Sequence, residues 1–349
     1  MYRTIDKSGG QEKIARINCK SFCLDIDAEK TYGEYLTKLV LFSQGRKRKS
    51  KPQKIEEVSI MDTPLKAGEI LNSRYRILSL IGHGGFGRTY LAEDLNRFNE
   101  HCVIKEFAPR LQNRFVVKKA QELFEREAQV LYRLQHAQIP KFYELFRWTY
   151  QDKQYLFLVQ EYIEGQTYQT IGNLRFSQGI RCTETEISNL LRQLLPVLEY
   201  IHSMGLIHRD ISPDNLMLRS TDELAVLIDF GSIKDTCTPG QLPIDCQSSM
   251  GTALGKRGYA PPEQMNQGLV GAHTDLYALA ATAIVLLTGK KPQELIDPNS
   301  YQWHLPEDLA LSCNLKWMLT TMLSPEPSDR FTSALEVKRA LKKSSTRAA

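Results

Sequence analysis

GLIHRDISPDN at residues 205–215, together with DFG at residues 229–231, is the part of this sequence that decides the fold. Asp210 lies in a polar turn, Asn215 follows it by five residues, and Asp229 follows it by nineteen. An enzyme that transfers a phosphoryl group needs one carboxylate to orient the attacking hydroxyl and oxygen ligands to hold Mg²⁺ on the phosphates. Asp210 suits the first role, and Asn215 with Asp229 suits the second. The joint spacing argues against a chance polar turn.

A glycine-rich stretch earlier in the chain lies between two expected strands. Residues 75–81 (YRILSLI) read as a strand, GHGGFG occupies residues 82–87, and residues 89–92 read as a second strand. Glycines let the backbone turn sharply and approach phosphate oxygens without a Cβ atom in the way. A dinucleotide-binding fingerprint would instead precede a helix. The pattern therefore favours a phosphate-binding hairpin, with Phe86 at its tip covering the site.

A lysine and a glutamate further along are expected to pair. Lys105 ends an apolar strand at residues 102–105, and a partly buried ammonium group needs a counter-charge to keep its proton. The next expected helix, residues 121–134, has an apolar stripe of Leu123, Leu131 and Leu134, and Glu127 falls on that stripe. We therefore predict a Lys105–Glu127 ion pair that directs the ammonium group at phosphate oxygens.

These motifs together resemble the eukaryotic-type serine/threonine protein kinases, over about residues 74–342. GGFGRTYLA at residues 84–92 and GYAPPEQ at residues 258–264 are similar to the bacterial, particularly cyanobacterial, branch. The resemblance implies an α+β, two-lobed protein-kinase fold. A small β-rich N-lobe with one long helix would span about residues 74–161, and a larger, mainly helical C-lobe would span about residues 165–342. It further implies that Glu263 pairs with Arg330 and that Asp275 braces the catalytic loop.

The resemblance also assigns site residues. ATP would lie between the lobes, where the implied nucleotide-binding residues are Ile81, Gly82, His83, Gly84, Gly85, Phe86, Gly87, Thr89, Val103, Lys105, Glu161, Ile163, Asn215 and Asp229. Asn215 and Asp229 are the implied Mg²⁺ ligands. The implied catalytic set is Asp210, Lys105, Glu127 and Arg209, to which we add Lys256.

We add Lys256 to the catalytic set because the chain departs from the family pattern at Ser212. Most serine/threonine kinases have a lysine there that contacts the transferred phosphate, so a positive charge is missing. Lys256 stands where these kinases usually place a threonine beside the catalytic aspartate. We hypothesise that Lys256 replaces the absent ammonium group; the alternative is two unrelated substitutions with Lys256 in solvent. Val103 and Pro261 replace the usual alanines, and we expect both exchanges to be tolerated.

Residues 232–260 form a long segment rich in Ser, Thr and Gly, and a loop of this kind inside a compact domain is usually functional. In the family, an arginine at the position of Arg209 commonly receives a phosphorylated residue of this loop, because guanidinium binds phosphate bidentately. Autophosphorylation of the loop is therefore expected, the candidates being Thr236, Thr238, Ser248, Ser249 and Thr252. The alternative is constitutive activity.

Composition sets the remaining limits. Residues 1–73 carry 14 Lys/Arg and 10 Asp/Glu, whereas residues 74–349 carry 31 and 30. The kinase-like part is thus nearly neutral, and we expect no nucleic-acid partner. Residues 1–60 read as a flexible extension with a basic linker at 46–54, and residues 343–349 read as a polar tail. Seven scattered cysteines, no signal-type start and no apolar run long enough to span a bilayer predict a cytoplasmic protein.

The leading interpretation is a protein kinase that transfers the γ-phosphate of ATP to serine or threonine hydroxyls of protein substrates. A pseudokinase that binds nucleotide or partners without turnover is the alternative, and the absent charge at Ser212 is its main support. A small-molecule phosphotransferase of the same two-lobed shape is a third reading. The loop that ends at Pro-Pro-Glu263 favours a protein substrate, since this segment forms the peptide platform in protein kinases.

Overall fold

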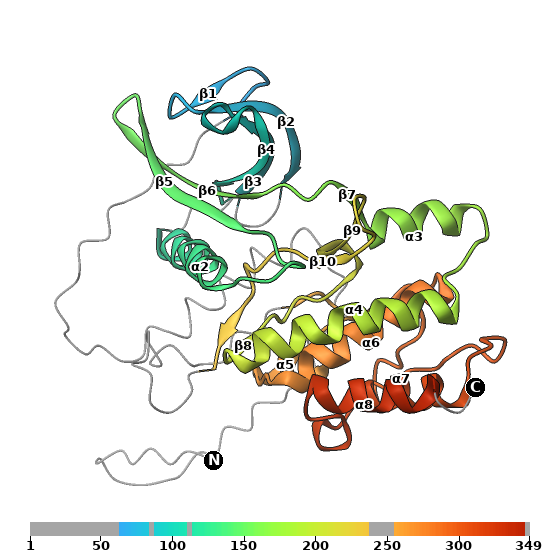
Figure 1. The fold of residues 1–349 in the computed structure, drawn as a ribbon. Coiled ribbons are helices and arrows are strands. Elements are labelled where there is room, and N and C mark those ends of the chain that lie inside the picture. The colour runs from blue at the N-terminus through green and yellow to red at the C-terminus, as the bar shows by residue number, and fades with distance from the viewer. Residues whose placement is uncertain (1–62, 84–86, 110–113, 237–254, 346–349) are drawn as a thin grey trace, which may run out of the picture.

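A computed structural model describes residues 63–83, 87–109, 114–236 and 255–345. They form an α+β fold of two lobes, with a β-sheet lobe above a mainly helical one (Figure 1). The expected two-lobed architecture is confirmed. The predicted extension 1–60, the glycine-loop residues Gly84, Gly85 and Phe86, and the loop candidates Thr238, Ser248, Ser249 and Thr252 lie outside the described residues.

The N-lobe is built on one antiparallel sheet whose strands lie in the order β1-β2-β3-β4-β6-β5. The strands are β1 (Ile70–Leu71), β2 (Tyr75–His83), β3 (Gly87–Asp94), β4 (Glu100–Phe107), β5 (Phe142–Tyr150) and β6 (Lys153–Glu161). A short 3₁₀ helix, η1 (Leu95–Arg97), links β3 to β4. Helix α2 (Arg114–Arg133) lies beneath the sheet on the side of β5 (Figure 1).

The N-lobe is larger than the sequence pattern indicated. Helix α2 begins seven residues before the expected start at residue 121, and β5 was not predicted at all. The lobe also begins before residue 74, because Leu65 and Leu71 are buried with Tyr75, Ile77 and Tyr90 in an apolar cluster on the sheet. A second cluster runs from α2 into the C-lobe, so this part of the N-lobe core is continuous with the core of the C-lobe.

The C-lobe consists of helices with short strands on the side that faces the N-lobe. Its helices are α3 (Tyr168–Ser177), α4 (Glu184–Ser203), α5 (Pro262–Gln267), α6 (Ala272–Thr288), α7 (Cys313–Met322) and α8 (Ala334–Ser345). Its strands are β7 (Gly165–Thr167), β8 (Leu206–Ile207), β9 (Leu216–Arg219), β10 (Ala225–Leu227) and β11 (Lys234–Asp235). The 3₁₀ turns are η2 (Pro213–Asn215), η4 (Pro292–Glu294) and η5 (Pro327–Asp329). Helix α8 continues into the stretch from residue 343 that was expected to be a polar tail.

Two central helices carry the catalytic loop. Helix α4 begins at a capping box in which the Thr183 side chain accepts from the Glu186 amide and the Glu186 side chain accepts in return from Thr183. It continues through Pro196 and buries the predicted apolar face against α6 and α8. Helix α6 is buried along almost its whole length, as its uniformly apolar sequence predicted. The catalytic loop leaves the end of α4 and lies against the start of α6.

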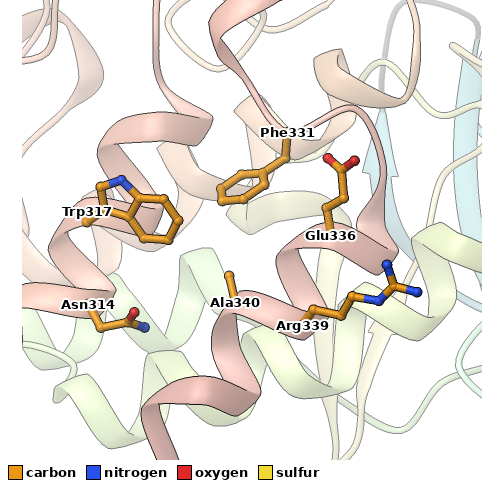
Figure 2. A pocket seen from close by; sticks show the side chains of 6 residues that line it. All are labelled: Asn314, Trp317, Phe331, Glu336, Arg339 and Ala340. Carbon is orange, nitrogen blue, oxygen red and sulfur yellow. The ribbon is translucent and has the colours of Figure 1, made fainter.

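A surface hollow of about 330 Å³ lies elsewhere, between α7 and α8. Trp317, Phe331 and Ala340 line it, with Arg339 and Glu336 at one side and Asn314 at the other (Figure 2). It belongs to the part of the C-lobe far from the sheet (Figure 1). No helix among the described residues is long and apolar enough to cross a membrane.

Candidate active site

The glycine-rich hairpin forms the roof of the site. Gly82 pairs with Thr89 across β2 and β3, and Thr89 pairs with Lys105 on β4. Gly87 has no room for a side chain, because a Cβ atom built there would lie 1.7 Å from the carbonyl oxygen of Glu106. Only glycine permits this close approach of the two strands. The described residues of the hairpin thus stand directly beside the strand of the expected nucleotide-binding lysine.

The predicted pair between Lys105 and Glu127 is present. Lys105 Nζ lies 2.5 Å from Glu127 Oε1 and 3.2 Å from Asp229 Oδ1, so one ammonium group joins the N-lobe helix to the DFG segment. Burial works to lower the pKa of Lys105, but the charges of Asp229 and Glu127 outweigh it and raise the pKa above its ordinary value. The ammonium of Lys105 in turn lowers the pKa of Asp229. Lys105 and Asp229 are therefore held in their charged forms at neutral pH, whereas burial raises the pKa of Glu127 against the opposing charge of Lys105.

The DFG segment turns Asp229 toward this pair. Asp229 has a left-handed backbone (φ 62°), and its side chain is half exposed to the space between the lobes. Phe230 is buried and packs edge-on against His208, with ring centroids 4.9 Å apart. A Cβ atom at Gly231 would approach Glu127 Oε2 to 3.2 Å, so glycine leaves room for the carboxylates on both sides. The segment thereby aligns a carboxylate with the Lys105–Glu127 pair.

Asp210 and Asn215 face each other in the catalytic loop. Asn215 Nδ2 donates to the backbone oxygen of Asp210 at 2.8 Å and to its carboxylate at 3.0 Å. Burial, together with the nearby charge of Asp229, raises the pKa of Asp210 to about 6, while Lys256 acts in the opposite direction. Since its amide nitrogen is committed to Asp210, Asn215 keeps its side-chain oxygen as a ligand atom.

Asp275 fixes the catalytic loop from below, as the family resemblance implied. Its carboxylate is fully buried and accepts from the backbone amides of His208 at 2.9 Å and Arg209 at 2.8 Å. The ring of His202 lies 2.8 Å from the same carboxylate. Arg209 holds a left-handed backbone (φ 70°), a conformation that non-glycine residues adopt only where surrounding contacts hold it. The buried acid supplies those contacts.

The connector between the lobes contains the remaining expected nucleotide contacts. Val103 is almost buried on β4 and pairs with Gln160, the last residue but one of β6. The Glu161 amide donates to the Lys141 carbonyl at 2.8 Å, and the Glu161 carboxylate accepts from the Lys141 amide at 3.0 Å. Ile163 is buried at the start of the C-lobe. Strand pairing thus sets the start of the connector beside β4, the strand that carries Lys105.

Arg209 is buried against the segment that follows DFG. Its Nε donates to the Ser232 carbonyl, and its Nη2 lies 3.5 Å from the Ile233 carbonyl. Burial lowers the pKa of Lys234 on β11, and the nearby positive charges of Arg209 and Arg126 lower it further. Three cationic side chains from the catalytic loop, β11 and α2 thus gather where the loop at residues 232–260 begins.

Ser212 and Lys256 occupy different surroundings. Ser212 is fully buried, and its hydroxyl oxygen has no hydrogen-bond partner among the described residues. Lys256 Nζ donates to Asp214 Oδ2 and lies 5.2 Å from the centre of the Tyr259 ring. Lys256 is close enough to the Asp210 carboxylate to lower its pKa, against the effects that raise it. The sequence did not indicate Asp214 as the partner of Lys256, because a carboxylate between a proline and an asparagine reads only as a turn residue.

The end of the loop is pinned to the C-lobe at two places. Arg330 binds Glu263 bidentately, at 2.7 Å and 3.1 Å, and both side chains are buried. This confirms the expected pair. Gln264 Nε2 donates to the Arg209 carbonyl at 2.8 Å, a link that sequence reasoning missed and that only its position next to Glu263 could have suggested. A direct hydrogen bond therefore joins the end of this loop to the catalytic loop.

Comparison with known proteins gives a consistent result. A family model described as the protein kinase domain matches residues 75–344. "Serine/threonine-protein kinase PknA" of Nostoc sp. is 40% identical over 281 residues, which are 78% of this chain and 48% of that protein. "Serine/threonine-protein kinase B" of Synechocystis sp. is 38% identical over 280 residues, 78% of this chain and 46% of that protein. The chain thus spans about half the length of the curated relatives it matches.

Solved structures agree with the architecture. The kinase domain of Mycobacterium tuberculosis PknI is 25% identical, with a TM-score of 0.59, and the match covers 80% of this chain and 99% of that one. The similarity therefore extends over both lobes.

Proposed function

Because this chain belongs to the protein kinase domain family, we propose that it transfers the γ-phosphate of ATP to serine and threonine hydroxyl groups of protein substrates. The observation that carries the proposal is the meeting of Lys105, Glu127 and Asp229 opposite the Asp210–Asn215 pair. Five groups from four distant parts of the sequence converge on one space between the lobes. Such convergence is what positioning and charge neutralisation in phosphoryl transfer require.

ATP is proposed to bind beneath the glycine-rich hairpin. The backbone of the hairpin, including residues 84–86, would cover the phosphates, and Lys105 would contact the α- and β-phosphates. Adenine would lie against Val103 and bond to the backbone of Glu161 and Ile163. The apolar burial of Val103 and Ile163 supports this placement, as does the charged state of Lys105.

Mg²⁺ is proposed to be held by Asn215 and Asp229. Their side chains offer an amide oxygen and a carboxylate, the hard oxygen ligands that Mg²⁺ prefers. The lowered pKa of Asp229 keeps that carboxylate ionised, and the commitment of Asn215 Nδ2 to Asp210 leaves its oxygen for a cation. The metal, when bound, neutralises charge on the phosphates. Asp210 would orient the substrate hydroxyl and accept its proton.

Lys256 is proposed to supply the positive charge that Ser212 does not. Its lowering effect on the Asp210 pKa supports this role. Arg209, with Lys234 and Arg126, is proposed to receive a phosphate on the loop at residues 232–260, formed by autophosphorylation. The gathering of three cations supports this. We also propose a cytoplasmic location, consistent with Cys102, Cys182 and Cys313 being free.

A transfer assay with radiolabelled ATP, Mg²⁺ and a generic protein substrate tests the proposal. The wild-type chain should label serine and threonine, and Asp210→Asn should not. Asp222→Asn is a matched control, because Asp222 lies in the exposed β9–β10 turn and, within the described part of the chain, bonds only Arg219 and nearby backbone. A chain that binds Mg-ATP without labelling any protein would be a pseudokinase, and the proposal would be wrong.

A further inference from the structure

A second glutamate, which no part of the proposed reaction uses, is buried beside Lys105. Glu106 is on β4 and has no exposed surface. Its carboxylate accepts from the Tyr90 hydroxyl at 2.7 Å and from Arg88 Nη1 at 3.2 Å and 3.3 Å. Burial raises the pKa of Glu106, and these two donors oppose that effect. A buried carboxylate is tolerated only while its donors stay in place.

The same two donors hold the chain where it enters the N-lobe. The backbone amide of Leu65 donates to the Tyr90 hydroxyl at 3.1 Å, and Arg88 Nη1 also donates to the Thr63 carbonyl at 3.1 Å. Leu65 itself is buried in the apolar cluster of the sheet. Residues 63–65 are thus fixed by two hydrogen bonds and one apolar side chain, and both bonds end on groups that bind Glu106. We call residues 63–65 the entry segment.

This network reaches the two strands that form the nucleotide site. Arg88 pairs with Glu106 across β3 and β4, and the next pair in register is Thr89 with Lys105. Arg88 directly follows Gly87, whose backbone is tightly packed against the Glu106 carbonyl. Any shift of Glu106 or Arg88 must therefore displace the end of the glycine-rich hairpin or the strand that carries Lys105, since packed strands do not deform independently.

We propose that Glu106 is a positioning residue for nucleotide binding, and that the entry segment, through Tyr90 and Arg88, keeps it in place. The Tyr90 hydroxyl is the centre of the arrangement, because it accepts from Leu65 and donates to Glu106. Loss of the entry segment leaves Tyr90 and Arg88 each short of one partner. Residues that precede the kinase domain thereby influence how well the domain holds ATP. Only the prediction for KM and kcat rests on the proposed function; the prediction for Mg-ATP binding does not.

Two buried tyrosines allow a matched test. Tyr90 and Tyr75 are both fully buried in the N-lobe, and each hydroxyl donates to a glutamate, Tyr75 to Glu144 at 2.5 Å. Tyr75 pairs with Asp94 at the end of the β2–β3 hairpin away from the glycines. Tyr90→Phe and Tyr75→Phe therefore remove equivalent hydroxyls from the same cluster, but only the first touches the entry segment and Glu106.

Binding of Mg-ATP to the full chain is measured by isothermal titration calorimetry, beside the melting temperature of each variant. Tyr90→Phe should raise the Kd for Mg-ATP about threefold to tenfold, which lies within the range typical of coupling through a contact network. Tyr75→Phe should change the Kd less than twofold at a similar loss of melting temperature. In the transfer assay, Tyr90→Phe should raise KM for ATP and leave kcat within twofold.

Equal Kd values for the two phenylalanine variants would overturn the inference, because stability alone would then explain both. Should Tyr90→Phe not fold, Leu65→Ala is compared with Leu71→Ala, since both leucine side chains are buried in one cluster. Leu65→Ala keeps the backbone amide that donates to Tyr90 but removes the apolar anchor of the entry segment, whereas Leu71 lies outside that segment. Equal Kd values for the two alanine variants would be equally decisive against it. A wild-type chain that binds Mg-ATP and labels no protein refutes the proposed function and leaves this binding test intact.

Discussion

Replacement of Lys256 by alanine distinguishes two roles for this residue: a charge that acts in catalysis, or one partner of an ordinary surface ion pair. Lys256 and Asp214 are each more than one-third exposed, so their ion pair contributes only about 0.5 kcal/mol to stability after screening by solvent. A charge that acts on the transferred phosphate contributes far more to the barrier, roughly 2–4 kcal/mol for a single preorganised donor. Lys256→Ala is therefore expected to lower kcat about 30- to 1,000-fold while the melting temperature falls by no more than about 2 °C.

The assay compares four chains in the transfer reaction: wild type, Lys256→Ala, Asp214→Asn and the double variant. Asp214→Asn removes the partner and keeps the ammonium group. If Lys256 only neutralises Asp214, then Asp214→Asn should rescue Lys256→Ala, because the uncompensated carboxylate is gone. If Lys256 acts on the reaction, Asp214→Asn alone should stay active, and the double variant should be as slow as Lys256→Ala.

A further variant restores a positive charge at residue 212, where most serine/threonine kinases have a lysine. Ser212→Lys in the Lys256→Ala background returns an ammonium group to the catalytic loop and is expected to recover part of kcat. The reasoning is refuted if Lys256→Ala turns over within twofold of wild type while Asp210→Asn is inactive. Rescue of Lys256→Ala by Asp214→Asn would refute it in a second way.

Three further outcomes are expected. The kcat/KM profile should fall with one-proton slope below about pH 6, because Asp210, whose pKa is raised to about 6, must lose its proton to accept the one from the hydroxyl; a flat profile from pH 7 to pH 5 would contradict this. Asp229→Asn should lower kcat roughly 100-fold and shift the Mg²⁺ titration to higher concentration; an unchanged titration would exclude Asp229 as a ligand. Glu263→Ala leaves Arg330 buried without its carboxylate and should cost about 3–5 kcal/mol in the free energy of unfolding, which chemical denaturation measures; a loss below about 1 kcal/mol would contradict it.

The sequence predicted the parts of the site whose positions follow from local periodicity. Glu127 could be paired with Lys105 because it falls on the buried stripe of α2, where an acid requires a partner. The same reasoning placed the inward face of α4 and the capping box at Thr183. In these cases the spacing of residues along one element already determines which side chains face the core.

Contacts made across strands and loops were beyond that reasoning. Glu106 directly follows Lys105, and in a strand the two side chains point to opposite faces, so the sequence marks Glu106 only as an acid after the lysine. Its burial depends on Tyr90, Arg88 and the entry segment. Strand register brings the first two together, and no sequence pattern predicts where the entry segment lies. Strand β5 was also missed, although its residues 144–149 alternate between half-buried and exposed.

The catalytic loop and the end of the following loop behave as one structural unit. Gln264 bonds the Arg209 carbonyl, and Lys256 bonds Asp214. Helix α5 is itself held by the buried Glu263–Arg330 pair. Lys256 thus projects from a backbone that is fixed on its C-terminal side, which helps a compensating charge, because an ammonium on a mobile loop would lose most of its effect to reorganisation. This arrangement predicts the effect of Gln264→Ala, which keeps the Lys256 charge but removes one hydrogen bond that holds its segment. Gln264→Ala should lower kcat, as Lys256→Ala does, but by a smaller factor. If Gln264→Ala slowed turnover more than Lys256→Ala did, the bond to Arg209 rather than the Lys256 charge would be the main contribution of this segment.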